Sequence, residues 1–336
     1  MFTNKPLTTP VLFSIFNRPD TTRKVFNAIK AAKPEKLFVS ADGPRRDVAG
    51  EDEKCKQTRA IIKQVDWKCE VYTNFREKNL GLKLTMSSGI DWFFKNVEEG
   101  IILEDDCLPT RTFFWFCQEL LEKYRDDEKI MAINGGNSQF GVKRGRASYY
   151  FSNIVGVWGW ASWRRAWRHF DLSLRSFPEF KKQNQIKNIF EDETSRIFWM
   201  TKIQETYDGG NSWAFPWAYS IFTQNGLCVT PNVNLVSNIG FGPDGVHATN
   251  PGSLFANIRT AGMKKIIHPT FILPNRNADE SSTKLAAQEQ LFNRGLVGRM
   301  KLVLKALVKK TLPVTHLNML RRVRQWGGRC YGKQKT

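Results

Sequence analysis

Three consecutive carboxylates, Glu104, Asp105 and Asp106, directly follow the apolar run Ile101–Leu103. Like charges at the end of a strand repel one another unless a cation or hydrogen-bond donors hold them. Carboxylate oxygens are the ligands that Mg²⁺ and Mn²⁺ prefer, and such a cation can bridge the cluster to a diphosphate and act as a Lewis acid on it. A solvated acidic turn is the alternative, but the position at a strand end favours a metal site.

Four further polar residues stand where the chain leaves its first three predicted strands. Asn17 and Arg18 follow the first strand, Asp42 follows the second, and Asn79 lies beyond the third. Ligands of a parallel sheet bind beyond the carboxyl ends of its strands, so we expect these residues and the acid triplet to form one ligand site. Lys83, at the start of the next predicted helix, adds a cation for phosphate, and a solvated surface role is its alternative.

The elements that position these residues alternate along the chain. Short apolar runs predict strands, and the amphipathic segments between them predict helices. Strands are expected at residues 11–16, 36–40, 70–73, 100–103, 130–133 and 227–231, and helices at residues 22–32, 53–64, 83–96, 111–124 and 164–170. This alternation predicts an α/β fold with a mostly parallel sheet flanked by helices.

The composition indicates a folded body with a basic tail. Of the 336 residues, 41% are hydrophobic, which is enough for a core and excludes a wholly disordered chain. The net charge is +19, and residues 294–336 hold twelve Lys or Arg and no Asp or Glu, which leaves +7 for the remainder. A mildly basic body suits an enzyme that handles a diphosphate substrate.

The tail itself has a helical pattern. Over residues 296–308 the Leu, Val and Met side chains share one helical face, and Lys301, Lys305 and Lys309 share another. We expect this face to dock on an anionic membrane surface, and a helix packed on the catalytic domain is the alternative. The predicted organisation is a catalytic domain at residues 1–274, a linker and short helix at 275–293 (with 275–283 as the linker itself), and the basic tail at 294–336.

Cysteine usage and the start of the chain favour a cytoplasmic protein. None of the six cysteines forms a Cys-x-x-Cys pair, so we expect reduced thiols. The first residues lack the basic segment and apolar run of a signal peptide, and no apolar run of about 18 residues is present to span a membrane. We expect the protein in the cytoplasm, with peripheral contact to the inner face of the membrane through its tail.

The acid triplet is part of a longer motif, Ile-Ile-Leu-Glu-Asp-Asp-x-x-Pro-x-x-x-Phe-Phe, at residues 101–114. It resembles the Glu-Asp-Asp form of the DxD motif in GT-A glycosyltransferases. It is most similar to the α-mannoside β-1,2-N-acetylglucosaminyltransferase family and to bacterial cell-surface glycan transferases. The resemblance runs in consistent order from about residue 10 to 270, through Phe38–Asp42, Leu82-Lys83, the acceptor-side element Gly156–Trp160 and the closing loop Phe241–His247.

The resemblance implies a fold and a set of roles. The fold would be the GT-A-like, Rossmann-like form of the parallel sheet. Glu104-Asp105-Asp106 would be the centre of the donor site, with Glu104 on the ribose hydroxyls and Asp106 on Mn²⁺ or Mg²⁺. Asp42 would pair with the base, and His247 would complete the metal shell. The two residues just past the first strand would line the nucleotide pocket.

One departure from the family concerns the catalytic base. The family carries a carboxylate between two tryptophans for inversion, whereas the equivalent stretch here, Trp213–Trp217, contains no acid. Asp208 and Asp244 are the candidate substitutes, and a retaining mechanism would need no such base.

The function expected is therefore a metal-assisted glycosyltransferase. It would move a sugar from a nucleotide-diphosphate donor, a UDP-sugar above all, to a glycan or lipid-linked acceptor. A sugar-nucleotide pyrophosphorylase is one alternative, disfavoured because the first strand lacks the Gly-rich loop that grips a triphosphate. A non-catalytic carbohydrate or nucleic-acid binding protein is another, which the missing base and the basic tail support. The body shows no nucleic-acid motif, so no nucleic-acid partner is expected.

Overall fold

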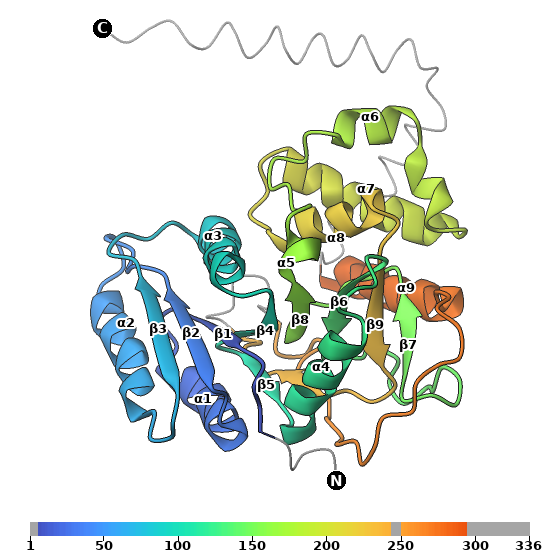
Figure 1. The fold of residues 1–336 in the computed structure, drawn as a ribbon. Helices are drawn as coiled ribbons and strands as arrows, with labels where there is room; N and C mark the ends of the chain where they lie inside the picture. The colour runs from blue at the N-terminus through green and yellow to red at the C-terminus, as the bar shows by residue number, and fades with distance from the viewer. Residues whose placement is uncertain (1–5, 243–249, 294–336) are drawn as a thin grey trace, which may run out of the picture. The chain divides into compact units, whose positions relative to one another are not determined.

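The computed structural model of the chain describes residues 6–242 and 250–293 (Figure 1). The chain divides into two compact units, residues 1–285 and 286–336. In the second unit the described residues, 286–293, form the end of the last helix. The predicted basic tail, residues 294–336, lies outside the described residues, and so does the predicted closing-loop segment 243–249.

The first unit is built on an eight-stranded sheet with the strand order β3-β2-β1-β4-β8-β6-β9-β7. Six of these strands run in one direction, and β7 and β8 run against them. The predicted α/β fold with a mostly parallel sheet is confirmed. The strands are β1 (Val11–Ile15), β2 (Lys36–Ala41), β3 (Glu70–Phe75), β4 (Glu99–Glu104), β6 (Ile130–Asn134), β7 (Tyr149–Ser152), β8 (Trp160–Trp163) and β9 (Leu227–Pro231).

Helices cover both faces of this sheet because its central strands are apolar on both sides. Val11 and Phe13 of β1 pack in the core cluster that includes α1 and α4, whereas Leu12 packs in the cluster that includes α3, α5 and α8. The α-helices are α1 (Pro19–Ala32), α2 (Glu51–Ala60), α3 (Leu82–Asn96), α4 (Arg111–Lys123), α5 (Arg164–Trp167), α6 (Phe177–Lys182), α7 (Glu193–Tyr207), α8 (Ala214–Thr223) and α9 (Arg276–Asn293). Two short 3₁₀ helices are η2 (Ile61–Gln64) and η3 (Gln185–Asn188).

The start of α1 fixes the residue that precedes it. Pro19 occupies the first turn, where its fixed φ suits a helix and its missing N–H is not needed. Val25, Phe26 and Ile29 then form the buried stripe that holds α1 against the sheet. Arg18 is therefore held at a defined point between β1 and α1.

A small antiparallel pair lies beyond the end of β4. It consists of β5 (Cys107–Pro109) and β10 (Val236–Asn238), with Cys107 opposite Asn238. This pairing brings residues 238–240 next to the acid triplet, although they are more than a hundred residues away in the chain.

Two segments differ from their sequence-based prediction. The helix expected after the Trp-rich stretch begins at Arg164 as α5, but Trp160–Trp163, for which no strand was predicted, forms β8, an antiparallel strand between β4 and β6. Residues 275–283 were expected to be a linker, but α9 begins at Arg276, and Ala278 and Asp279 are buried. Asp279 accepts hydrogen bonds from Asn153, which packs the start of α9 against the body.

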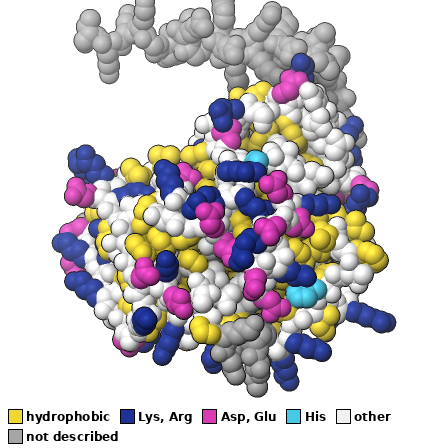
Figure 2. Space-filling view, viewed as in Figure 1, with side chains coloured by type: hydrophobic (Ala, Val, Ile, Leu, Met, Phe, Trp, Pro, Cys, Tyr) yellow, Lys and Arg dark blue, Asp and Glu magenta, His cyan; other side chains and the backbone are white. Residues whose placement is uncertain are grey.

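Within the described residues, no helix is both long and apolar enough to cross a membrane. The five cysteines of this part of the chain are all free thiols. On the face of the molecule in Figure 2, Lys and Arg side chains are interleaved with Asp and Glu, so the charge there is mixed rather than of one sign.

Candidate functional site

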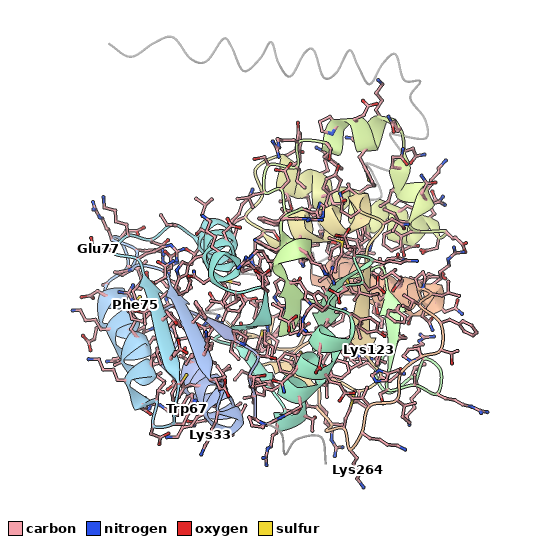
Figure 3. The ribbon with its side chains drawn as sticks, viewed as in Figure 1. Lys33, Trp67, Phe75, Glu77, Lys123 and Lys264 are labelled. Carbon is pink, nitrogen blue, oxygen red and sulfur yellow. The ribbon has the colours of Figure 1, made fainter. Side chains whose placement is uncertain are left out.

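The predicted site residues meet at the point where the strand order of the sheet reverses. From β1 the chain proceeds outward to β2 and β3 and then returns to place β4 on the other side of β1. Ser14 of β1 lies opposite Glu104 of β4, so both strands end at the same level. In open α/β sheets this reversal is where ligands bind, beyond the carboxyl ends of the strands. Figure 3 shows those ends on the β3 side, with Glu77 just past the strand and Trp67 at the opposite end.

Arg18, which follows β1, forms ion pairs with Asp105 and Asp106, which follow β4. Its Nη2 lies 2.6 Å from Asp105 Oδ1, and its Nη1 lies 3.1 Å from Asp106 Oδ2. Asp105 also accepts a hydrogen bond from the backbone N–H of Phe16 at 3.2 Å. Burial disfavours the charged guanidinium, but the adjacent carboxylates outweigh this effect and raise the pKa of Arg18.

Glu104 differs from its two neighbours. No hydrogen-bond donor of the described part of the chain reaches its half-buried carboxyl group. Burial, together with the nearby carboxylates of Asp106 and Asp105, raises the pKa of Glu104. Burial also raises the pKa of Asp105, although the guanidinium of Arg18 opposes that shift. The cluster therefore favours ligands that bring positive charge or hydrogen-bond donors.

Gly240 lies over the Arg18–Asp106 pair, and sequence reasoning did not identify it. A Cβ on Gly240 would collide with Asp106 Oδ2 and would lie 2.6 Å from Arg18 Nη1. The position is fixed by two backbone contacts, because Ile239 donates to the carbonyl of Asp106 at 2.8 Å and Gly240 donates to Asn238 Oδ1 at 2.9 Å. Only glycine fits here without moving the ion pair.

Asp42 holds the loops beside the site together. Its Oδ1 accepts from the backbone N–H groups of Gly43 and Leu80, both at 2.9 Å, and its Oδ2 accepts from Gly81 at 3.0 Å. The residue is only 4% exposed. The resemblance implied that Asp42 pairs with a base, whereas in the structure its carboxylate connects the loop after β2 to the loop after β3.

Glu51 plays a similar part on the other side of that loop. Asn17 Nδ2 donates to Glu51 Oε1 at 2.8 Å, and the backbone N–H of Arg45 donates to Glu51 Oε2 at 2.6 Å. Hydrogen bonding from Arg45 lowers the pKa of Glu51 against the opposing effect of burial. The predicted ligand-binding residue Asn17 is thus engaged by a buried carboxylate that looks, in sequence, like an ordinary acid in the first turn of α2.

Asn79 and Lys83 contact the loop after β2 and the loop before α8, respectively. Asn79 Nδ2 donates to the carbonyl of Gly43 at 2.8 Å, so it supports the same loop as Asp42. Lys83, in the first turn of α3, donates from Nζ to the carbonyl of Gly210 at 3.4 Å. Both side chains are half-buried at the strand ends, next to the predicted site.

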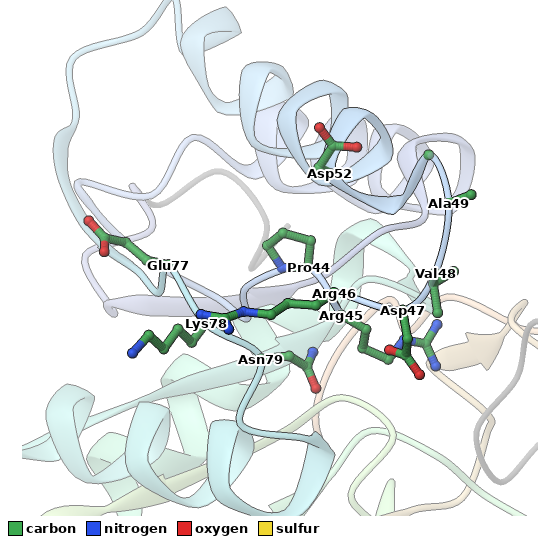
Figure 4. A pocket seen from close by; sticks show the side chains of 11 residues that line it. Pro44, Arg45, Arg46, Asp47, Val48, Ala49, Asp52, Glu77, Lys78 and Asn79 are labelled. Carbon is green, nitrogen blue, oxygen red and sulfur yellow. The ribbon is translucent and has the colours of Figure 1, made fainter.

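A cavity of about 620 Å³ opens between the loops that Asp42 connects (Figure 4). It is lined by residues 44–50, Asp52 and residues 77–79. Its charges balance, since Arg45, Arg46 and Lys78 face Asp47, Asp52 and Glu77. This volume is within the usual range of small-molecule sites, and the mixture of donors and acceptors suits a polar ligand.

Of the two candidate bases, Asp208 is engaged by a neighbour in its own turn, and Asp244 lies outside the described residues. Asp208 is exposed at the end of α7 and accepts a hydrogen bond from Gln204 at 2.8 Å, as a turn residue does. Asp244 and the predicted metal ligand His247 lie outside the described residues. Residues 213–217 contain no acid, and α8 begins at Ala214.

The carboxylates offer the oxygen chemistry that Mg²⁺ or Mn²⁺ requires. Asp106 is the more accessible of the two that face Arg18, with 13% of its side chain exposed against 4% for Asp105. Both are paired with the guanidinium, and no group of three or more His, Cys, Asp or Glu within residues 6–242 and 250–293 is placed to hold a metal ion. The donor atoms therefore fit a divalent cation only if Arg18 releases one of them.

No protein-family profile matches the chain. No curated protein sequence matches it either. Among solved structures, HddC from Yersinia pseudotuberculosis is similar at 8% identity over 47% of this chain and 78% of that one, with a TM-score of 0.30. An apo UDP-glucose pyrophosphorylase is similar at 11% identity over 67% and 90%, with a TM-score of 0.34. The 4-diphosphocytidyl-2C-methyl-D-erythritolsynthase from Anaerococcus prevotii DSM 20548 is similar at 9% identity over 55% and 85%, with a TM-score of 0.29. These TM-scores are too low to favour any one activity.

Proposed function

We propose that the chain is a glycosyltransferase that takes a nucleotide-diphosphate sugar, with UDP-sugars the first donors to test, and transfers the sugar to a glycan or lipid-linked acceptor. One observation carries this proposal. Arg18 pairs with Asp105 and Asp106 at the reversal of the strand order, where β1 and β4 end at the same level. A cation paired with acids at this point suits the charged diphosphate and its counter-ion.

The connection after β1 favours sugar transfer over nucleotidyl transfer. Only the three residues Phe16–Arg18 separate β1 from α1, and none of them is glycine. A loop that grips a triphosphate uses several glycines whose backbone N–H groups surround the phosphates. A segment this short offers one arginine to the phosphates instead, which suits a diphosphate that is already joined to its sugar.

The metal and the base complete the proposal. Asp106 would ligate Mn²⁺ or Mg²⁺, with His247 as a further ligand. When bound, such an ion stabilises the negative charge that develops on the leaving diphosphate. Asp244 would act as the base that takes the proton of the acceptor hydroxyl, and Asp208 is the comparison residue. Asp244→Asn should slow transfer far more than it weakens donor binding, and Asp208→Asn should have a mild effect.

The basic tail adds a partner to the proposal. Its twelve uncompensated Lys and Arg residues favour an anionic membrane surface, where a lipid-linked acceptor would lie. Sedimentation of the full chain and of a chain ending at Phe292 with anionic vesicles tests this part separately. Equal sedimentation of the two chains would contradict it.

The catalytic proposal is tested with the full chain and a panel of nucleotide sugars in the presence of Mn²⁺. We expect slow, metal-dependent hydrolysis of at least one donor in the absence of acceptor, and its loss in Asp106→Asn. The matched control is Asp126→Asn, since Asp126 is an exposed acid in the turn before β6, outside both the triplet and the lining of the cavity. Exchange of labelled pyrophosphate into a nucleotide sugar would instead identify a pyrophosphorylase. Binding of nucleotide sugars with neither reaction would identify a non-catalytic binding protein.

A further inference from the structure

The two ion-pair contacts of Arg18 differ in length and in burial. The contact with Asp105 is shorter, at 2.6 Å, and Asp105 is the more deeply buried acid, with 4% of its side chain exposed. The contact with Asp106 is 3.1 Å long, and 13% of that side chain is exposed. The buried contact is the costlier one to break, because a carboxylate left unpaired away from water is strongly destabilising. The outer contact is the one that can be exchanged.

An incoming divalent cation needs the atom that Arg18 now occupies. Asp106 Oδ2 accepts from Arg18 Nη1, and its other oxygen, Oδ1, lies 3.4 Å from the Cys107 thiol. A guanidinium and a metal ion compete for Oδ2, since like charges repel at that distance. Gly240 lies so close to Nη1 and Oδ2 that a Cβ there would collide with Oδ2, so a side chain could not enter between them.

We propose that Arg18 occupies the place of the divalent cation in the ligand-free protein and gives it up when a metal–diphosphate ligand binds. Nη1 leaves Asp106, while Nη2 keeps its contact with Asp105. The guanidinium thus remains at the site with donors free to meet a diphosphate oxygen, and Asp106 is free to meet the metal. This inference rests on the proposed function, because it assigns a positioning role to a residue of the same site.

Arg18 should weaken the binding of Mn²⁺ alone and strengthen the binding of the nucleotide. An opposite charge at this range changes the proton affinity of a carboxylate by roughly 10- to 1000-fold. Removing the guanidinium should therefore tighten the binding of Mn²⁺ alone by at least about tenfold by the same reasoning. The same change should weaken the binding of UDP, because a phosphate-facing cation has been lost.

The test is a titration of the full chain with Mn²⁺ alone, in which the electron paramagnetic resonance signal of free Mn²⁺ measures binding. Arg18→Gln removes the charge, and Arg18→Lys keeps one charge that cannot bridge both acids. We expect Arg18→Gln to bind Mn²⁺ most tightly, Arg18→Lys less tightly and the wild type least, and Asp106→Asn added to Arg18→Gln to abolish the gain. Arg125→Gln is the matched control, since Arg125 pairs with Glu99 at the opposite end of β4, at 2.8 Å.

A second readout guards against a variant that folds poorly. Melting temperatures are measured with and without Mn²⁺, and the ion should stabilise Arg18→Gln or Arg18→Lys more than the wild type. If Mn²⁺ neither binds nor stabilises either variant better than the wild type, Arg18 does not hold the place of the cation. The proposed function fails on a different result, namely that no form of the chain binds UDP or a UDP-sugar, whatever the order of the Mn²⁺ affinities.

Discussion

Replacement of Asp42 by Asn tests whether this carboxylate holds the neighbouring loops together or contacts the base of a nucleotide. The carboxylate accepts three backbone N–H groups, and each comes from a loop that borders the cavity. An asparagine of the same shape can keep its oxygen on Gly43 and Leu80, but its amide nitrogen then faces the N–H of Gly81. One charge-assisted bond is lost, a buried donor is left without an acceptor, and the two remaining bonds lose their ionic character.

These losses set the expected magnitude. A hydrogen bond to a charged group contributes about 1.5–3 kcal/mol, and an unsatisfied buried donor costs about 1–3 kcal/mol. We expect Asp42→Asn to lower the free energy of unfolding by about 2–4 kcal/mol, since the two estimates describe the same N–H and overlap. Urea denaturation followed by tryptophan fluorescence measures this, with an unchanged m-value as the sign that the native fold persists.

The control and the refuting result follow from the same bonds. Asp52→Asn, an exposed acid that lies 3.5 Å from Lys56, should change the free energy of unfolding by no more than about 0.5 kcal/mol. UDP affinity should fall in Asp42→Asn in proportion to the loss of loop order. If the variant is as stable as the wild type but loses UDP affinity, Asp42 contacts the base directly and the structural role assigned to it is wrong.

Two further substitutions test other parts of the structure. Burial raises the pKa of Asp279 to about 6, so its native form holds a proton more strongly than its unfolded form. The contribution of Asp279 to stability should therefore fall as pH rises from about 4 to about 6, by at most about 1.4 kcal/mol per pH unit. In denaturation measured across that window, the stability of the wild type relative to Asp279→Asn should show this slope. Gly240→Ala should force Arg18 and Asp106 apart and cost about 1–3 kcal/mol of stability. Gly242→Ala should not, since no atom of the described residues lies within 4 Å of a Cβ there. Equal melting temperatures for the two would contradict the close approach of Gly240.

The sequence predicted well which residues lie at the carboxyl ends of the strands, because the pattern that marks a strand end is local. The apolar runs of β1, β2 and β4 end in polar residues, and parallel strands bring those ends together regardless of what lies between them. The sequence therefore places Arg18 and Asp106 in one site, and the structure shows them in contact. That the guanidinium would sit on the carboxylates was not predicted, since residue types do not specify which charges pair.

The remaining differences arise where long-range packing outweighs local pattern. The polar residues around Asp279 look like a linker, yet the carboxylate accepts hydrogen bonds from Asn153, 126 positions earlier in the chain. The Trp160–Trp163 segment has no alternation of polar and apolar residues because all four residues are buried on both faces of the sheet. Gly240 shows its role only when its neighbours are known, since a lone glycine in a loop has many explanations.

In the proposed function, Asp106 and Arg18 form a metal-assisted site for a nucleotide diphosphate. Calorimetric titration of the full chain with UDP, with Mn²⁺ and then with excess EDTA, measures whether they do. Wild-type protein should bind UDP at least about tenfold more tightly with Mn²⁺, as expected when a cation bridges a carboxylate to a diphosphate, and Asp106→Asn should lose that gain while keeping its melting temperature within a few degrees. Equal UDP affinity with and without Mn²⁺ in both proteins, or no UDP binding at all, would contradict the claim.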